Sequence, residues 1–293
     1  MIFELRNDSC RAFADTHGGE LISFMGTDNR EHIWQGSPDS WTGRNPILFP
    51  IVGRLRDGKV RFEGETCEMP QHGLARRREF TLLHKFRESV ELEQREDEET
   101  LRHYPYPYRL RVRHELIDSG FVTSFEVFNP GERPMPFCIG AHTGFCCPMR
   151  EGERFEDYVL RFDEEETVSS IRVTPSGALS KKDRLPVLAG ARDYPLTHGV
   201  FDSCDTLIFD SLRSHGVSLM NPETGHGVHM DFAGFPLFAV WTMPHANAPY
   251  LCLEPWVGCA AMEDDTGDFL DKPFCVTLAP GESWQIRYTV TLF

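Results

Sequence analysis

Two segments each place a proton-transferring side chain in an unusual backbone setting. In the first, His142 lies between Gly140 and Gly144 in the otherwise apolar run PFCIGAHTGFCCP, residues 136–148. The glycines permit unusual backbone angles and a close approach of a ligand. An imidazole with a pKa of about 6.5 can transfer protons near neutral pH. His142 is therefore a candidate catalytic group, and a satisfied core histidine is the structural alternative.

The second segment supplies a carboxylate, Glu254, in the run LCLEPWVGC at 251–259. Glu254 follows strand-forming residues, and a carboxylate at the end of a buried strand is costly unless it is paired or used in chemistry. Pro255 and Trp256 follow it, and the indole offers a flat apolar surface on which the C–H face of a sugar can stack. Glu254 is thus a second candidate catalytic group, and Trp256 a candidate ligand contact.

Two further segments could direct cationic or imidazole groups into a cleft. The apolar part of NPILFPIVGRLRD, residues 45–57, ends at Arg54, whose fork of donors suits ring oxygens or hydroxyl groups. A surface arginine at a strand end is the simpler alternative. The run PQHGLARRR, residues 70–78, places His72 in a loop, where it could be only a turn residue. The arginines at 76–78 could form an anion pocket or a solvated face.

Acidic and metal-binding patterns are less specific. The run FDSCDTLIFDS at 201–211 contains three aspartates, which could accept hydrogen bonds from hydroxyl groups or simply form turns. His226 and His229 have a spacing that places them on opposite faces of a strand, with no third ligand nearby, so we expect no metal site there. No Gly-rich phosphate loop or serine nucleophile elbow is present. The sequence therefore predicts no cofactor.

Alternation with a period of two recurs along the chain and predicts strands, whereas helical periodicity is scarce. Residues 286–292 alternate apolar and polar types, which indicates a half-buried strand. Residues 109–116 and 121–128 flank a turn at 118–120 and predict a hairpin. Further strands are expected at 78–84, 89–94, 155–162, 206–209, 216–220, 227–232 and 235–242.

The organisation of these elements predicts one domain spanning residues 1–293. Its 20 prolines and 24 glycines lie between the strands rather than in a linker. Residues 97–103 predict a short helix, and residues 164–196, rich in charge, Ser, Gly and Pro, are expected to form a long, weakly structured excursion. Many short strands with few helices predict an all-β fold, a large antiparallel β-sandwich or a barrel.

Composition excludes several classes of partner. The formal net charge of -15 would repel phosphate backbones and anionic lipid surfaces, so we expect neither nucleic acid nor membrane as partner. The N-terminus lacks the pattern of a signal peptide, and no apolar run approaches the length of a membrane span. Nine scattered cysteines without a C-x-x-C pair suggest reduced, mostly buried thiols. These features predict a cytoplasmic protein.

Taken together and in order, these segments resemble the aldose 1-epimerase (galactose mutarotase-like) family, and within it a LacX-like bacterial branch. The resemblance covers nearly the whole chain. It rests on five motifs at comparable separations, which are NPILFPIVGRL at 45–55, MPQHGLAR at 69–76, PMPFCIGAHTGF at 134–145, DTLIF at 205–209 and LEPWVG at 253–258. Each motif alone is weak evidence, but five in register are strong. The resemblance implies a galactose mutarotase-like supersandwich.

The resemblance also implies roles for individual residues. Glu254 matches the general base and His142 the general acid. The implied sugar-binding groups are Arg54, His72 and Asp205, with Asp202 as the alternative if the register of that segment differs. The branch usually has Gly-Gly-His-Pro where this chain has Gly140-Ala141-His142-Thr143, so the loop that places the histidine could differ.

The implied reaction is the interconversion of the α and β anomers of a free hexose. Removal of the proton from the anomeric hydroxyl and protonation of the ring oxygen open the ring to an aldehyde, which closes on the other face after rotation about C1–C2. A carboxylate and an imidazole with pKa values of about 4.3 and 6.5 suit these two transfers, and no cofactor is required.

Three alternatives remain at this stage. The arginines Arg54, Arg76, Arg77 and Arg78 could bind a phosphate, which would make the substrate a hexose 6-phosphate, although the acidic net charge argues mildly against an anion. A non-catalytic carbohydrate-binding protein would have no need for both His142 and Glu254. A glycoside hydrolase needs two carboxylates beside the scissile bond, and Glu254 alone lies in a clear motif.

Overall fold

The computed structural model describes residues 1–293, of which 49% are in strands and 9% in helices. Antiparallel pairing joins the strands into two large sheets and three small ones. The prediction of an all-β antiparallel fold is therefore confirmed. None of the helices has the length and apolar character needed to span a bilayer.

The larger sheet has nine strands in the order β15-β14-β17-β18-β22-β10-β9-β8-β7. In chain order its strands are β7 (Thr81–Lys85), β8 (Ser89–Arg95), β9 (Arg109–Ile117), β10 (Gly120–Phe128), β14 (Val159–Val173), β15 (Leu179–Pro195), β17 (Gly216–Met220), β18 (Gly227–Asp231) and β22 (Ser283–Leu292). The smaller sheet has the order β16-β19-β20-β12-β4, and β13 also pairs with β20. Its strands are β4 (Ile47–Leu48), β12 (Ile139–Ala141), β13 (Thr143–Cys146), β16 (Thr206–Phe209), β19 (Leu237–Trp241) and β20 (Tyr250–Val257).

Shorter elements complete the fold. The small sheets consist of β1 (Ile2–Arg6), β2 (Arg11–Asp15) and β3 (Leu21–Met25), of β5 (Lys59–Phe62) and β6 (Glu65–Glu68), and of β11 (Met135–Phe137) and β21 (Val276–Leu278). The α-helices are α1 (Glu98–His103) and α2 (His198–Cys204), and the 3-10 turns are η1 (Arg56–Gly58), η2 (Ala75–Arg77), η3 (Phe155–Asp157) and η4 (Phe269–Asp271).

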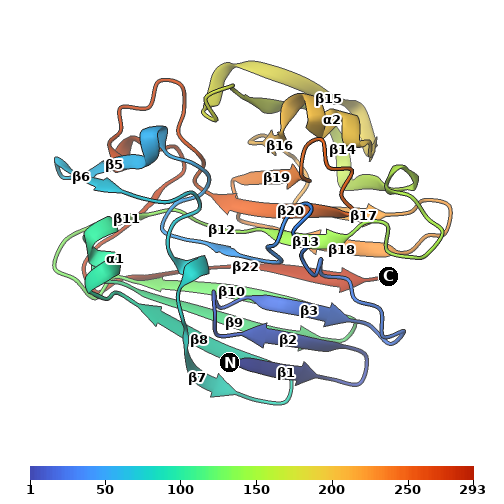
Figure 1. Cartoon of the computed structure of the whole chain (residues 1–293), viewed down its shortest axis with the longest axis horizontal. Coiled ribbons are helices and arrows are strands. Elements are labelled where there is room, and N and C mark those ends of the chain that lie inside the picture. Colours follow the sequence, from blue (N-terminus) through green and yellow to red (C-terminus); the bar gives the residue numbers. More distant parts are fainter.

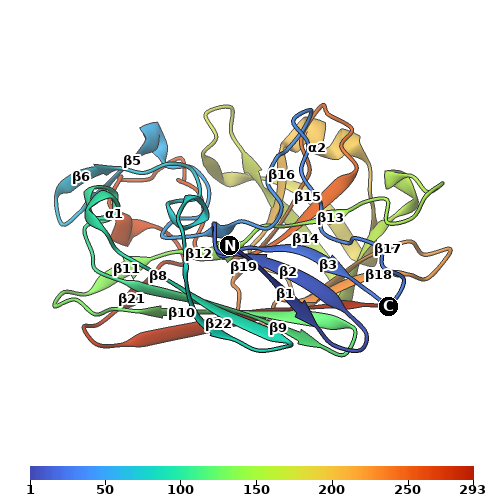
Figure 2. The same ribbon diagram turned by 60° about the horizontal axis from the view of Figure 1, so that its bottom comes forward.

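The smaller sheet lies over the middle of the larger one (Figures 1 and 2). A single cluster of 73 buried residues fills the space between the layers. Strands β9 and β10 form the hairpin expected from the sequence, with Ile117 paired to Gly120. A Cβ at Gly120 would lie 2.1 Å from the carbonyl oxygen of Val290 on β22, so only glycine allows the third strand to approach here.

Most of the predicted elements are confirmed, and the boundaries of several strands shift. The helix expected at 97–103 begins at Glu98, after the N-cap residue Asp97, whose side chain accepts a hydrogen bond from the backbone N–H of Thr100 in a capping box. The strand expected at 78–84 begins only at Thr81, because the backbone forms the turn η2 just before it. The strand expected at 155–162 begins at Val159 for the same reason, after η3.

The prediction of a weakly structured excursion at 164–196 was wrong. Strands β14 and β15 form a long hairpin that projects from the end of the larger sheet (Figure 1). Four register shifts interrupt the pairing, and they also interrupt the period-two alternation that would have revealed the strands. Ser170 on β14 accepts a 2.8 Å hydrogen bond from the backbone N–H of Ile208, so the hairpin holds β16 in place.

Glu166 anchors the base of this hairpin, and its replacement tests that role. Its Oε1 atom accepts hydrogen bonds from the N–H of Arg213 and from the N–H and hydroxyl of Ser214, at 3.0, 2.7 and 2.7 Å. We expect Glu166→Gln to lower the free energy of unfolding by about 1–3 kcal/mol, because an amide NH₂ group would face these donors. Urea denaturation measures the change.

The exposed neighbour Glu165 provides a matched control. Glu165→Gln makes the same chemical change, and we expect it to alter stability by less than about 0.5 kcal/mol. Equal unfolding midpoints for the two variants would contradict the anchoring role of Glu166.

Candidate active site

One cavity of about 480 Å³ brings together the side chains singled out from the sequence. It lies where β20, the β12–β13 junction, the start of β16 and the loops after residues 53 and 71 meet. The predicted site residues among its lining are Arg54, His72, Arg76, His142, Asp205, Glu254 and Trp256. Asp202 does not line it. The Asp202 carboxylate instead accepts a 2.6 Å hydrogen bond from the backbone N–H of His245.

His142 and Glu254 face each other inside the sheet. Thr143 pairs with Leu253 and Gly140 with Trp256, so His142, at the junction of β12 and β13, lies opposite Glu254 on β20. The Nε2 atom of His142 is 3.3 Å from Oε1 of Glu254, and the two side chains are only 8% and 2% exposed. Two polar groups that can exchange a proton are therefore held in contact, out of bulk water.

Burial disfavours the charged form of both groups. It raises the pKa of Glu254 well above its ordinary 4.5, against the opposing effects of the Trp256 indole and the Arg76 guanidinium. It lowers the pKa of His142 well below 6.5, and His72 and Arg76 add to this effect. Between these two pKa values the pair carries a single proton, and without a ligand burial favours the arrangement in which neither group is charged.

His72 is fixed in a neutral form. The backbone N–H of Gly53 donates a 3.2 Å hydrogen bond to its Nδ1 atom, and its Nε2 atom lies 3.2 Å from the side-chain amide nitrogen of Gln71. Burial, together with Arg76 and Arg54, lowers the pKa of His72 to about 3. The backbone φ angle of His72 is +65°, which residues other than glycine rarely adopt. The surrounding contacts therefore impose this conformation.

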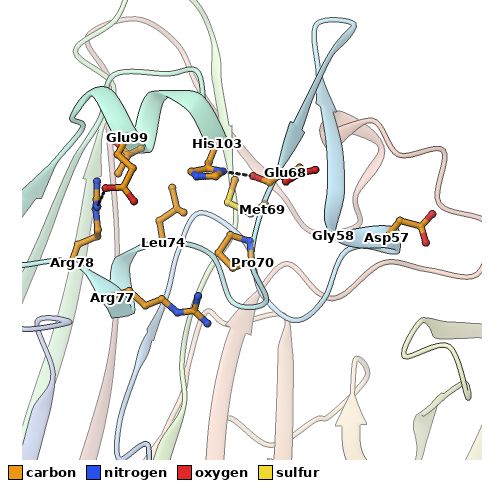
Figure 3. Close-up of a pocket in the computed structure, with 11 residues that line it drawn as sticks. Asp57, Gly58, Glu68, Met69, Pro70, Leu74, Arg77, Arg78, Glu99 and His103 are labelled. Carbon is orange, nitrogen blue, oxygen red and sulfur yellow. Dashed lines mark hydrogen bonds and ion pairs between the residues drawn. The ribbon is translucent and has the colours of Figure 1, made fainter.

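Three arginines line the cavity without forming an ion pair. Arg54 donates a 3.3 Å hydrogen bond to Gln71, and no carboxylate lies within 4 Å of Arg54, Arg76 or Arg77. Arg77 also borders a separate hollow of about 530 Å³, which Leu74 and Pro70 help to line (Figure 3). There the neighbouring Arg78 is bound to Glu99, whereas Arg77 remains unpaired. Three free guanidinium groups give this part of the cavity a positive field.

Aromatic side chains also line the cavity and pack around His142. Trp41, which the sequence analysis missed, stacks on His142 with ring centroids 4.8 Å apart and an interplanar angle of 29°. Trp241 contacts the edge of the same imidazole. Trp256 also lines the cavity and is buried, with 5% of its surface exposed. Trp41 was missed because its loop carries no alternation or motif.

Asp205 occupies the start of β16 as an exposed carboxylate on the cavity wall. The hydroxyl of Thr206 donates a 2.6 Å hydrogen bond to the Asp205 carboxylate, and the backbone φ angle of Asp205 is +67°. Of the two aspartates considered from the sequence, Asp205 is therefore the one that a ligand in the cavity can reach.

Residues 1–291 match the family described as Aldose 1-epimerase. The chain belongs to the aldose 1-epimerase family. A relative in that family, Protein LacX, plasmid, from Lactococcus lactis subsp. lactis, is 34% identical over 299 residues, which cover 100% of this chain and 99% of LacX.

Two solved structures resemble the epimerase fold described above. A galactose mutarotase related enzyme from Lactobacillus acidophilus shares 29% identity with a TM-score of 0.95, over 100% of this chain and 97% of the other. A galactose mutarotase-like protein from Lactobacillus casei ATCC 334 shares 28% identity with a TM-score of 0.93, over 100% of both chains. The galactose mutarotase-like fold expected from the sequence is confirmed.

The departure from the usual motif of this epimerase branch has a structural explanation. Thr143, which stands where proline is usual, is fully buried and pairs within the sheet. Its hydroxyl donates a 2.8 Å hydrogen bond to the side chain of Asn45, at the start of the NPILFP motif. This bond ties two of the family's motifs together, and His142 still lies against Glu254.

Metal-ligating side chains gather at the His142–Glu254 pair rather than at the histidines considered from the sequence. His226 bonds to Tyr158 and Thr224, and His229 to Ser218. His142, Glu254 and Cys252, by contrast, each have a potential ligand atom within 4.8 Å of the others.

The loop carrying His72 gives one testable prediction. Gly73 has φ +75°, and a Cβ there would lie 2.2 Å from the carbonyl oxygen of Phe49. Leu74 and Ala75 both donate backbone hydrogen bonds to that oxygen. We expect Gly73→Ala to displace His72, to lower the melting temperature and to reduce activity by at least about tenfold.

Gly64 offers the matched control. Its φ is +89°, but no atom lies within 4 Å of a Cβ built there. We expect Gly64→Ala to cost only about 1 kcal/mol of stability and no activity. If Gly73→Ala behaved like Gly64→Ala, steric positioning of His72 by Gly73 would be refuted.

The buried carboxyl of Glu254 gives a second prediction, on stability. A raised pKa in the folded state means that folding is penalised at any pH above the ordinary value of 4.5, and that the penalty disappears below it. We expect Glu254→Gln to be more stable than wild type at pH 7 by at least about 1 kcal/mol, since one pKa unit corresponds to about 1.4 kcal/mol.

Thermal unfolding of wild type and Glu254→Gln across pH 4 to 8 measures this difference in stability. Titrating groups that do not contact Glu254 contribute equally to both proteins and drop out of the comparison. The advantage of the variant should shrink as the pH falls towards 4.5. A constant difference, or one that grows on acidification, would show that burial does not raise this pKa.

Proposed function

We propose that the chain is an aldose 1-epimerase that interconverts the α and β anomers of a free hexose. The observation that carries this proposal is the buried contact between His142 and Glu254, 3.3 Å apart at the wall of the cavity. An imidazole and a carboxylate in contact supply both proton transfers that anomerisation needs. No step of the reaction requires a cofactor.

The two residues act as a pair that conserves one proton. Moving that proton from Glu254 to His142 generates a carboxylate and an imidazolium. Glu254 then accepts the proton of the anomeric hydroxyl while His142 donates to the ring oxygen, and the ring opens to the aldehyde. After rotation about C1–C2, the reverse transfers close the ring on the other face. Burial favours the neutral pair that exists at the open-chain stage, so it stabilises the intermediate arrangement.

The remaining lining residues orient the sugar. His72 offers its imidazole, Arg54 offers a guanidinium fork, and the Asp205 carboxylate accepts hydrogen bonds from hydroxyl groups. Trp41 and Trp241 provide an apolar surface for the C–H face of the ring. A lining with both polar and aromatic side chains suits the two kinds of surface that a hexose presents.

The unpaired arginines favour one second candidate, a hexose 6-phosphate as the substrate. The cavity is bordered by Arg54, Arg76 and Arg77, none of which has a carboxylate partner. A phosphate group bound there would supply an anion to pair with these guanidinium groups. Inhibition of hexose turnover by inorganic phosphate, together with faster turnover of the 6-phosphate than of the free sugar, would select this candidate.

Nine free cysteines, seven of them buried, support our placement of the activity in a reducing compartment, the cytoplasm.

Polarimetry of freshly dissolved α-glucose and α-galactose tests the proposal. We expect wild type to accelerate the approach to anomeric equilibrium, and His142→Ala and Glu254→Gln each to lower the rate by about 10² to 10⁴, because each removes one positioned proton transfer. Circular dichroism must first show that both variants are folded.

A wild-type protein that accelerates neither the free hexoses nor their 6-phosphates, yet binds them, would instead be a carbohydrate-binding protein. A variant that kept full activity would exclude the replaced residue from the mechanism.

A further inference from the structure

Cys252 lies beside the catalytic pair, although the proposed reaction does not use it. Cys252 and Glu254 are two residues apart on β20, so their side chains point to the same face of the strand. Potential ligand atoms of Cys252, Glu254 and His142 all lie within 4.8 Å of one another, and all three residues are buried. A soft sulfur, an imidazole nitrogen and a carboxylate oxygen thus converge on one point.

The spacing of this cluster fits a tetrahedral cation. Zn²⁺ binds histidine nitrogen and carboxylate oxygen at about 2.0–2.1 Å, so two such ligands on a tetrahedron are separated by about 3.3–3.4 Å. His142 Nε2 and Glu254 Oε1 are 3.3 Å apart. A thiolate at about 2.3 Å from the metal would complete three corners, about 3.6 Å from the other two ligand atoms, so from within the 4.8 Å limit the sulfur would move inward by up to about 1.2 Å.

Two further observations point to an incoming ligand at this place. Glu254 Oε2, the partner oxygen of the Oε1 atom that faces His142, is buried and has no hydrogen-bond partner in the protein. Buried polar atoms without partners are rare, because each costs free energy until something binds it. The cavity leads to both residues, so a small solute can reach them.

We propose that His142, Cys252 and Glu254 form a binding site for a soft divalent cation of the Zn²⁺ type, and that the cation inhibits the epimerase. Binding displaces the proton shared by the pair and the thiol proton of Cys252 to solvent, and leaves three protein ligands with a fourth position open to the cavity. His142 and Glu254 then cannot transfer protons. The inhibition rests on the proposed function, whereas the binding itself does not.

The ligand set selects among cations. Thiolate and imidazole ligands suit Zn²⁺, whereas Mg²⁺ and Ca²⁺ prefer oxygen ligands and six or more of them. Mg²⁺ is therefore the control metal, and we expect it neither to bind here nor to inhibit.

The test compares Zn²⁺ binding by wild type, Cys252→Ala and Cys146→Ala, in competition with a chromophoric chelator. Cys252 takes no part in the proposed catalysis, so its replacement should leave metal-free activity unchanged. Cys146, half-buried on β13, controls for adventitious binding to a more accessible thiol. We expect one Zn²⁺ per chain in wild type and Cys146→Ala, and an affinity at least about tenfold weaker in Cys252→Ala.

Polarimetry on the same three proteins follows the inhibition. Zn²⁺ should slow wild type and Cys146→Ala at concentrations that leave Cys252→Ala active. Unchanged Zn²⁺ affinity in Cys252→Ala, or loss of binding in Cys146→Ala, would overturn the proposed site. Binding of one Zn²⁺ through Cys252 by a protein without epimerase activity would refute the proposed function and leave the metal site standing.

A measurement on wild type covers the case in which Cys252→Ala does not fold. Co²⁺ bound by a thiolate shows a sulfur-to-metal charge-transfer band, and tetrahedral coordination gives intense visible bands. Both are expected on addition of Co²⁺ and should be lost when Zn²⁺ is added. Octahedral spectra without the sulfur band would exclude the site.

Discussion

The removal of His142 and Glu254 from bulk water is the constraint on which the other features of the site depend. An imidazole and a carboxyl group in contact, both nearly inaccessible, are costly to fold, because water no longer solvates either charge. Strand pairing holds them together: β12 and β13 lie on one side of β20, so neither group can turn away without breaking the sheet. A hydrophobic core of 73 residues offsets this cost.

The surroundings of the pair are organised around the same constraint. The half-buried Arg76 lies close enough to influence the pKa of His72, His142 and Glu254, so one guanidinium both stabilises the carboxylate and keeps the imidazoles neutral. Trp41 covers the face of His142 and limits access of water. A site of this kind responds to a polar ligand more strongly than an exposed one would, since few competing dipoles are present.

Sequence patterns predicted much of the fold because antiparallel strands with one buried face alternate in polarity, as residues 109–128 and 286–292 do. They failed for the β14–β15 hairpin, where bulges break the alternation. Motif order predicted the lining of the cavity, since the motifs supply loops that meet there. Side-chain contacts across the fold, such as those of Trp41 and Cys252 with His142, carry no local signal and required the structure.

The pairing of β20 also limits where insertions and deletions can occur in the chain. Side chains alternate between the two faces of a strand, so a one-residue insertion or deletion between Tyr250 and Glu254 would move Leu253 or Pro255 into the cavity and turn the carboxylate into the opposite layer. Length changes should therefore be tolerated in the outer turns, around Gly152 or Gly225, where a Cβ meets nothing, and be absent from this strand.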